Sequence, residues 1–396
     1  PDPALIHEAN MEPWWFETGL DWGDGIVYPH GFCARFRQWG LNEIFDDLSH
    51  FTRAHQEQMA RSLAYEISSM RAASELGGYV ITEFTDVHWE CNGLLDMQRH
   101  VKHGLERLTR LNQDQVVLLR PQRWNARAGE TLSVDVQTLG IDGPGTEGQV
   151  TWTCATGEGT LPAPGGTIEV SMPTAAGSGL LTLQAAWQGP DGETLATNAV
   201  DVAWLAPRIA KMPLSVADEG LAEVLRSQGY ALVDNPAEAA VQIHTTLTPE
   251  VLLRVQQGAH VVLLAGGETT EEKQVPLPSG RLVPRAGTAW QGDWAQSFSW
   301  LKPRPPFDHL PGGPLLGMPY VNVMPDYVLA GLPAWAFKAH SWAGLAVGWL
   351  HKPASSLSRF PYGRGELVIS TFRLNADTVA EDAVAQALLD GMLRLF

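Results

Sequence analysis

Cysteine, basic residues and long apolar runs are all scarce in this chain of 396 residues. Its three cysteines, Cys33, Cys91 and Cys154, are odd in number and too few for a disulfide framework. Lysine and arginine total 27 against 44 aspartates and glutamates, and the net charge of −17 argues against nucleic acid or an anionic membrane surface as a partner. Neutral ligands are compatible with this charge.

Neither a signal segment nor an apolar run of roughly 18 residues is recognisable, so we expect a soluble protein without a membrane partner. The small number of cysteines favours the cytoplasm, although the sequence does not identify the compartment. The chain begins at Pro1 rather than at methionine, and we therefore expect further sequence upstream.

Hydrophobic residues make up 44% of the chain and tryptophan occurs 15 times, which is ample material for buried cores in two or three domains. Changes in composition predict domains at 1–114, 115–206 and 207–396. In the middle part, short alternating segments separated by Gly- and Pro-rich turns predict an immunoglobulin-like β-sandwich. These segments span 132–139, 149–153, 167–172, 179–187 and 194–204.

The C-terminal part alternates helical and strand patterns, as in a parallel α/β sheet. Helices are expected at 219–228, 249–257 and 379–395, and strands at 230–233, 240–244, 259–264 and 367–372. Residues 275–360 form an insert rich in Pro, Gly and Trp. This insert is predicted to be either a second aromatic surface or a cover for the sheet edge.

The N-terminal part opens with an aromatic, glycine-containing loop over residues 1–40, and apolar stripes at helical spacing follow from 41 to 76. A single helix of that length would exceed roughly 50 Å, so two helices are expected, with a break near 49–52. The unbroken run of β-favouring residues at 79–84 predicts a parallel strand buried on both faces. A further short helix is expected at 101–112.

Acidic, aromatic and amide side chains crowd at the end of this predicted strand, where barrel enzymes place their active sites. Trp89 offers a stacking surface to a sugar ring, or packs against the aromatic N-terminal loop. Asp86, Glu90 and Asn92 either bond sugar hydroxyls or cap the turn that follows. Glu83 bonds sugar hydroxyls or orients the nucleophile, or else it forms a hydrogen-bonded ion pair with Arg or Lys inside the barrel mouth. These five residues are the candidate substrate-binding set.

Residues 79–99 resemble the eighth strand and following loop of the (β/α)8 catalytic domain of glycoside hydrolase family 2, which contains β-galactosidases, β-glucuronidases and β-mannosidases. In that family an aromatic and acidic cluster precedes an Asn-Gly element and a basic residue, as here with Asn92-Gly93 and Arg99. The order of barrel and sandwich is similar too. Residues 207–396 resemble the flavodoxin-type, class I amidotransferase-like domains found at the ends of some sugar hydrolases.

The resemblance implies the C-terminal portion of a retaining glycosidase that cleaves O-glycosidic bonds of β-linked sugars. We expect no cofactor and assign no metal-binding residue, although a hydrolase of this family could bind a hard cation through Asp or Glu, which the sequence does not locate. Family members use one glutamate as acid/base and another as nucleophile, and both would lie upstream of Pro1, so this chain alone would be inactive. A missing N-terminal barrel segment or a homo-oligomer partner would complete the site for a carbohydrate substrate. The alternative function is a non-catalytic carbohydrate-binding or assembly module.

Two glutamates within the chain imitate the catalytic pair of the family. Asn42-Glu43 resembles the acid/base dipeptide and Glu83 the nucleophile, but only 40 positions separate them. Because one βαβ unit takes roughly 30 residues, these glutamates cannot belong to strands four and seven. Glu83 alone remains an alternative nucleophile if the run at 116–119 were the eighth strand. The absence of a closing helix after that run favours 79–84 instead.

The amidotransferase-like part lacks the residue on which that chemistry depends. No cysteine follows Cys154, so this part is predicted to be non-catalytic. Its adjacent glycines after residue 264 do not have the spacing of a nucleotide loop. A zinc site is disfavoured as well, because strand-end and helix contexts separate its potential ligands. Those ligands would be His88, Cys91, His100 and His103.

Overall fold

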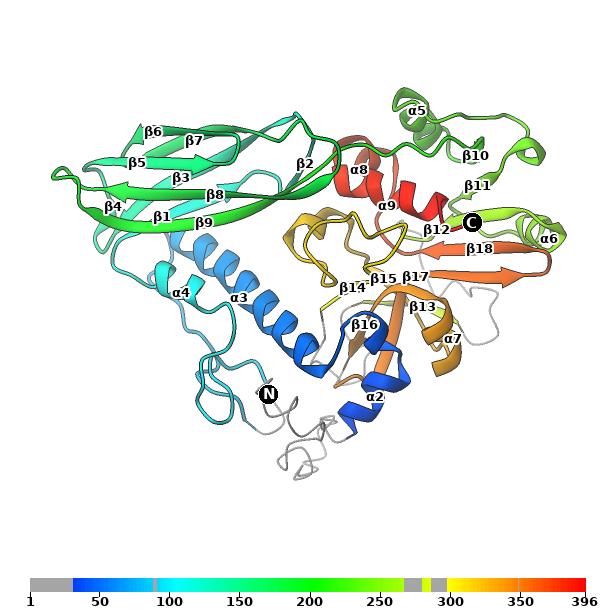
Figure 1. Cartoon of the computed structure of the whole chain (residues 1–396), viewed down its shortest axis with the longest axis horizontal. Helices are drawn as coiled ribbons and strands as arrows, with labels where there is room; N and C mark the ends of the chain where they lie inside the picture. Colours follow the sequence, from blue (N-terminus) through cyan, green and yellow to red (C-terminus); the bar gives the residue numbers. More distant parts are fainter. Residues whose placement is uncertain (1–30, 88–90, 267–279, 286–297, 348) are drawn as a thin grey trace. The chain divides into compact units, whose positions relative to one another are not determined.

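The computed structural model describes residues 31–87, 91–266, 280–285, 298–347 and 349–396 (Figure 1). These residues form a mixed α/β protein whose strands are arranged in three sheets. They group into two compact units, one within 47–206 and 317–319, the other within 31–46, 207–316 and 320–396. The three-domain division at 1–114, 115–206 and 207–396 stays a prediction. Within the described ranges, no helix is long and apolar enough to span a membrane.

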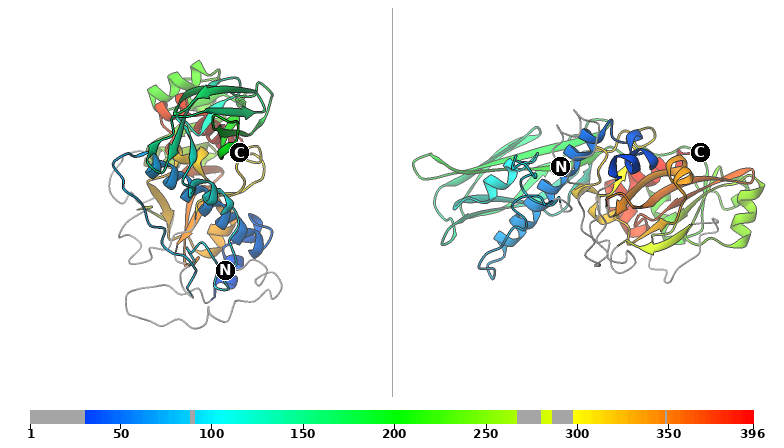
Figure 2. Two further views of the ribbon diagram at one scale, coloured as in Figure 1. Left: turned by 90° about the vertical axis from the view of Figure 1, so that its left-hand side faces the viewer. Right: turned by 90° about the horizontal axis from the view of Figure 1, so that it is seen from below.

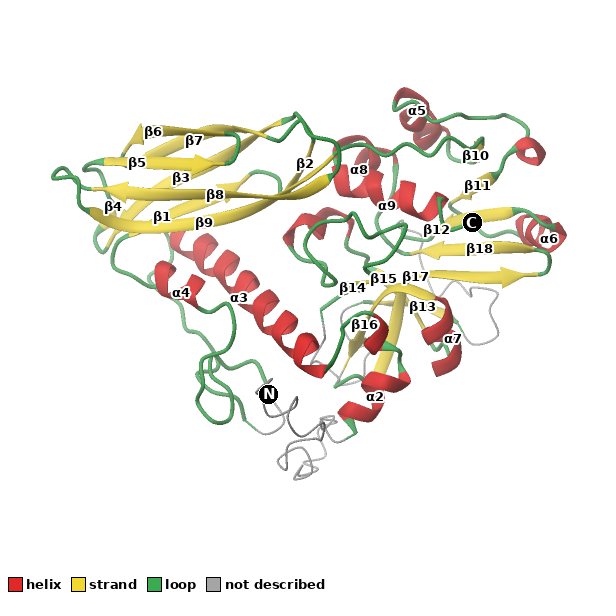
Figure 3. Ribbon diagram, viewed as in Figure 1, coloured by secondary structure: helices red, strands yellow, loops and turns green. Residues whose placement is uncertain are grey.

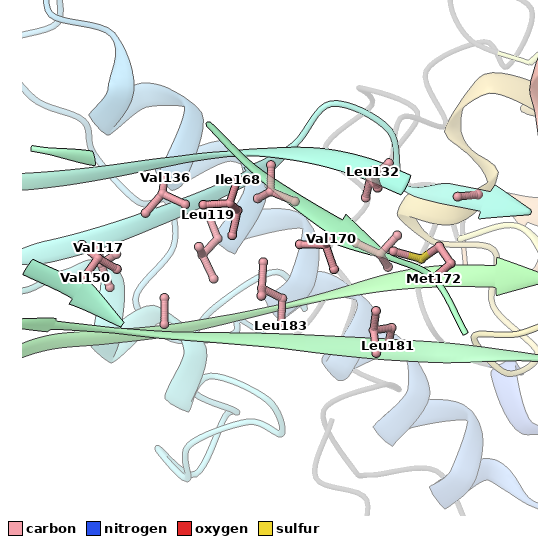
Figure 4. Packing of buried hydrophobic residues seen from close by; sticks show 14 of the residues in the cluster. Val117, Leu119, Leu132, Val136, Val150, Ile168, Val170, Met172, Leu181 and Leu183 are labelled. Carbon is pink, nitrogen blue, oxygen red and sulfur yellow. The ribbon is translucent and has the colours of Figure 1, made fainter. Parts of the chain in front are cut away.

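Two sheets of the first unit pack face to face as a β-sandwich. One sheet contains β1 (Val116–Pro121), β3 (Thr131–Gly140), β4 (Gly143–Pro144) and β7 (Gly165–Ser171). The other contains β2 (Asn125–Arg127), β5 (Gln149–Cys154), β6 (Gly157–Pro162), β8 (Ser178–Gln188) and β9 (Thr194–Leu205). Alternate side chains of both sheets meet in one apolar core, in which Leu132, Val150 and Leu183 are fully buried (Figure 4). All five predicted strand segments of this part are confirmed.

Strand β1 is buried on both of its faces, which explains its continuous apolar sequence. Val117 and Leu119 point into the sandwich core. Val116 and Leu118 belong instead to a second apolar cluster, formed with helix α3 (Leu48–Ala72) and helix α4 (Glu106–Leu111). The chain of the first unit therefore carries its helices on the outer face of one sandwich sheet. β1 pairs antiparallel with β3, so residues 116–119 are no closing barrel strand.

Helix α3 is one uninterrupted helix of 25 residues, which Figure 2 shows as a straight rod. Its start is fixed by Asp47, whose side chain accepts a hydrogen bond from the His50 backbone N–H at 2.6 Å. The predicted break near 49–52 is therefore wrong, because the helix begins at Leu48 and continues through these residues without interruption. Only the short 3-10 helix η2 (Leu41–Glu43), which belongs to the second unit, precedes it. The helix predicted at 101–112 is confirmed only as the shorter α4.

The second unit is built on a nine-stranded mixed sheet. Its parallel part contains β10 (Leu214–Val216), β11 (Val241–His244), β12 (His260–Leu264) and β18 (Gly365–Ser370). Its antiparallel part contains β13 (Arg281–Pro284), β14 (Trp300–Leu301), β15 (Tyr327–Ala330), β16 (Ser341–Val347) and β17 (Lys352–Tyr362). β17 joins the two parts, since its second half pairs with β18 and its first half with β15 and β16.

The helices of this unit match the predictions at 219–227 and 249–257, but the helix at 32–38 lies in the stretch 1–40 that was predicted to be a loop. They are α2 (Phe32–Gln38), α5 (Glu219–Ser227), α6 (Pro249–Gln257), α7 (Ala334–His340), α8 (Ala376–Glu381) and α9 (Ala383–Leu393). The predicted C-terminal helix is split at Asp382, whose side chain caps α9. The strand predicted at 230–233 is not formed, because Leu232 alone of these four described residues makes a bridge, to Leu214.

The described residues of the Trp-rich insert are part of the sheet itself, because they supply the antiparallel strands that extend it. Trp300 is 2% exposed and packs edge-on against Phe337. Trp335 on α7, by contrast, is 71% exposed. Trp290 and Trp294 lie outside the described residues.

Candidate functional site

The segment at 79–84, predicted as a buried parallel strand, is irregular, with bends at Thr82 and Phe84, and belongs to no sheet. Figure 3 draws the chain between α3 and α4 as loop. Tyr79 and Ile81 pack against the cluster formed by α3, α4 and β1, whereas Val80 is 89% and Phe84 64% exposed. The prediction of a strand buried on both faces is therefore wrong for the described chain. A parallel strand needs hydrogen-bonded neighbours, and no described segment pairs with residues 79–84 as a sheet.

The end of this segment is held by the returning chain. Backbone N–H groups of Leu94 and Leu95 donate to the carbonyls of Glu83 and Phe84 at 3.1 and 3.0 Å. The N–H of Asp86 donates in turn to the Leu95 carbonyl at 2.9 Å. These three bonds fix the candidate residues at 83 and 86 against the start of the segment at 94.

Gly93 makes this close approach possible. A Cβ atom at this position would lie 2.5 Å from both the Asp86 nitrogen and the Thr85 carbonyl carbon. The Asn-Gly element noted in the sequence is thus required by backbone packing, whatever else it does.

Asp86 and Lys102 form a buried ion pair at the centre of the loop. The Lys102 Nζ to Asp86 Oδ1 distance is 2.5 Å, and the two side chains are 2% and 0% exposed. Lys102 also donates to the Cys91 carbonyl at 3.0 Å, and Asp86 accepts from the Gly93 N–H at 3.0 Å. Pairing and added hydrogen bonds are what a charge needs to be tolerated in the interior. The geometry accordingly gives Asp86 a structural bond, and a direct contact with substrate stays a prediction.

A second buried carboxylate orders the far side of the loop. Asp96 is 4% exposed, and its Oδ1 accepts the backbone N–H groups of Gln98 and His100 at 2.8 and 2.9 Å. This turn places Arg99 in the left-handed region, at φ 68°, with its side chain exposed. The basic residue that the resemblance matched to Arg99 is therefore at the surface, while the buried cation is Lys102.

The structure brings three of the five predicted substrate-binding residues into one loop framework. Glu83 is half-buried, Asp86 is buried and Asn92 is exposed. Trp89 and Glu90 lie outside the described residues, as does His88. Their roles in substrate binding remain predictions.

The sequence reasoning missed Lys102, the residue that ties this framework together. It lies 16 positions after Asp86, and no motif spacing connects the two. The sequence placed Lys102 at the start of the helix predicted for 101–112. In the structure the helix begins only at Glu106, and Lys102 lies in the loop before it.

The glutamate that imitates the acid/base has a different environment. Glu43 lies in the second unit, and its Oε2 is 3.4 Å from Nζ of Lys302, a side chain that is 3% exposed. Burial lowers the pKa of Lys302, and the Glu43 carboxylate opposes that shift. Glu43 belongs to the second unit and Glu83 to the first, and the sequence argument that they are no catalytic pair stays a prediction.

The described residues contain no assembled metal site, and packing explains the glycine after β12. Nowhere in these ranges do three or more His, Cys, Asp or Glu side chains come together in a way that could hold a metal ion. Burial raises the pKa of the Cys91 thiol, which disfavours the thiolate that binds metals. After β12, a Cβ on Gly266 would lie 2.2 Å from the Phe372 carbonyl oxygen, so packing accounts for this glycine.

Comparisons with known proteins assign no family. No protein-family model matches the chain, and no curated protein matches it. Among solved structures, a polysaccharide lyase is 16% identical over 28% of this chain and 14% of its own, with a TM-score of 0.18.

Two further structures align over short stretches. The CARDB domain of a Pyrococcus furiosus protein is 14% identical over 23% of this chain and 88% of its own, with a TM-score of 0.18. An FMN-binding β-glucuronidase from Facaelibacterium prausnitzii L2-6 is 10% identical over 37% of this chain and 27% of its own, also with a TM-score of 0.18. The chain thus spans well under half of the two enzymes it matches. These are distant matches to parts of carbohydrate-active enzymes and to a small β-rich domain, and TM-scores this low carry no argument about activity.

Proposed function

We propose that this chain is the C-terminal portion of a retaining glycoside hydrolase acting on β-linked sugars, of the kind found in glycoside hydrolase family 2. The nucleophile and acid/base glutamates are supplied by sequence upstream of Pro1. The chain itself contributes the closing strand of the barrel at 79–84 and sugar-binding side chains from the loop that follows. Those side chains are Glu83, Trp89, Glu90 and Asn92, with Asp86 behind them.

The proposal rests on the packing, exposure and hydrogen bonding of residues 79–84. Tyr79 and Ile81 of this segment pack on an apolar cluster that includes α3, as a barrel strand packs on its outer helix. Val80 and Phe84, by contrast, are exposed. Among the described residues, the backbone of 78–82 makes no main-chain hydrogen bond to another segment. Apart from the bonds that Leu94 and Leu95 donate to the carbonyls of residues 83 and 84, these are the properties of a barrel strand separated from its two neighbours.

Expression of the gene with its upstream sequence tests the proposal. A panel of 4-nitrophenyl β-glycosides should be hydrolysed by the longer protein and not by the 396-residue chain. Hydrolysis should proceed with retention through two carboxyl groups about 5 Å apart. Glu43→Gln is the matched control and should leave turnover unchanged, because Glu43 pairs with Lys302 in the second unit. Turnover by the 396-residue chain that disappears in Glu83→Gln would make Glu83 the nucleophile and overturn the strand assignment.

The second candidate function is a carbohydrate-binding or assembly module without chemistry. One described feature favours it, the side chain of Trp335, which is 71% exposed on α7 and could stack on a sugar ring. Sugar binding measured by calorimetry, lost in Trp335→Ala or Trp89→Ala with no turnover by any length of the protein, would select this function over hydrolysis.

A further inference from the structure

The buried pair formed by Asp86 and Lys102 lies beside an exposed amide that the proposed function uses. Asp86 Oδ1 accepts the N–H of Gly93, and Lys102 Nζ donates to the carbonyl of Cys91. Asn92 is the residue between these two contacts, and its side chain is exposed. The two buried side chains are therefore hydrogen-bonded to the backbone on both sides of Asn92.

The same pair is joined to Glu83 through the backbone. The N–H of Asp86 bonds the Leu95 carbonyl at 2.9 Å, and the N–H of Leu94 bonds the Glu83 carbonyl at 3.1 Å. The N–H of Lys102 donates to the Leu94 carbonyl at 3.3 Å. A displacement of Lys102 or Asp86 would consequently shift Asn92 relative to Glu83.

Stability alone is a weak explanation for this arrangement. Removing two ions from water costs several kcal/mol for each, and apolar residues of similar volume often stabilise a protein as well as a buried pair does or better. The pair makes hydrogen bonds to the backbone at Cys91 and Gly93, which apolar residues cannot make. These bonds fix the direction of the backbone at both positions.

We propose that Asp86 and Lys102 are positioning residues that hold the Asn92 amide in the orientation needed to bond a hydroxyl of a neutral sugar. This inference rests on the proposed function and deepens it. Neither residue touches the sugar, and both act through the backbone of residues 91–93. Asn92 is the contact with substrate.

The test uses the longer protein and the 4-nitrophenyl β-glycoside that it hydrolyses fastest. The double variant Asp86→Leu/Lys102→Met removes both charges together, so no lone buried ion remains to unfold the loop. The variant should stay folded, with a lowered thermal unfolding temperature, because the Gly93 N–H and the Cys91 carbonyl each lose a hydrogen bond. Its kcat/KM should fall between about tenfold and a hundredfold, the effect of a misplaced contact. Arg107→Met is the matched control, because it breaks another ion pair of the first unit, with Glu57 at 2.7 Å, and should leave kcat/KM unchanged.

A double-mutant cycle distinguishes positioning from general damage. In an Asn92→Ala background the Asp86→Leu/Lys102→Met change should have little further effect on kcat/KM, because its only route to the sugar is already removed. A loss that simply adds to that of Asn92→Ala overturns the inference, as does an unchanged kcat/KM in a folded double variant. If the double variant does not fold, Asp86→Glu keeps both charges and moves the carboxylate by one methylene. A folded Asp86→Glu variant with parental kcat/KM also overturns the inference.

Failure of the proposed function itself would be visible earlier. The unmutated longer protein would then hydrolyse no glycoside and bind no sugar in calorimetry. A parent that is active, with variants that behave as stated, supports both the function and the positioning role.

Discussion

Asp390 holds Arg394 one helical turn further along α9, with 2.6 Å between Oδ2 and Nε. The carboxylate is 2% exposed and also accepts the Ala210 backbone N–H at 2.5 Å. Every residue of α9 is buried, so Asp390 is a charge placed on an otherwise interior helix of the second unit. Burial and the negative charge of Asp390 also raise the pKa of Tyr230.

Asp390→Ala should lower the free energy of unfolding by about 3 kcal/mol, because it strands the Ala210 N–H and removes the partner of Arg394. Chemical denaturation measures this. Asp390→Asn is the control and should have a clearly smaller effect, because its amide oxygen can still accept the Ala210 N–H and no buried charge is left without a partner. Equal losses in the two variants would contradict the assignment of Asp390 as the anchor.

His55 on α3 should make stability depend on pH. Burial lowers its pKa to about 4 from an ordinary value of 6.5, against a weaker opposing effect of the Phe51 carbonyl at 2.8 Å. Below pH 6.5 the unfolded chain therefore binds a proton that the folded chain does not. Stability is full above pH 6.5 and falls as the pH drops toward 4, by up to about 3 kcal/mol in total.

Urea denaturation at pH 7 and pH 5 measures this effect, with the His55→Phe variant as comparison. The variant should lose less stability between the two pH values than the parent. Identical losses would show that other groups account for the dependence.

Val80 and Ile81 should respond differently to the same change. Val80→Lys in the 396-residue chain should alter the free energy of unfolding by less than about 0.5 kcal/mol, because Val80 is 89% exposed. Ile81→Lys should destabilise this chain, because Ile81 packs on the apolar cluster of α3 and β1. In the longer protein Val80→Lys should become destabilising as well, since the proposed barrel would bury that face. A Val80→Lys variant that is neutral in both lengths would argue against barrel closure by this segment.

Gly93→Ala should destabilise the loop by about 1–3 kcal/mol, because its Cβ would collide with the backbone of Thr85 and Asp86. Gly77→Ala is the matched control in the same loop. Nothing lies within 4 Å of a Cβ at Gly77, so that variant should be neutral or slightly stabilising. Thermal unfolding of both variants gives the comparison, and equal midpoints would refute the close approach at Gly93.

Local pattern predicted much of this fold. The alternation in strands β3, β5, β7, β8 and β9 and the apolar stripes of α5 and α6 are written in short windows of sequence, and each is found in place. The predicted helix break near 49–52 failed because a single capping side chain, that of Asp47, outweighs the periodicity around it. The strand predicted at 230–233 is reduced to the single bridge between Leu232 and Leu214, because a strand extends only as far as its neighbour pairs with it.

The candidate site, too, could be predicted from the sequence only in part. The sequence located the polar stretch from Glu83 to Asn92, because side chains of those types cluster visibly along the chain. It could not find Lys102 as the partner of Asp86, since loop closure over 16 positions leaves no periodic trace. The sequence by itself determined which segments are apolar, which alternate and where charge is concentrated. Only the tertiary structure decided which face of 79–84 is covered and which charges are paired, because burial and pairing depend on residues brought together from distant parts of the chain.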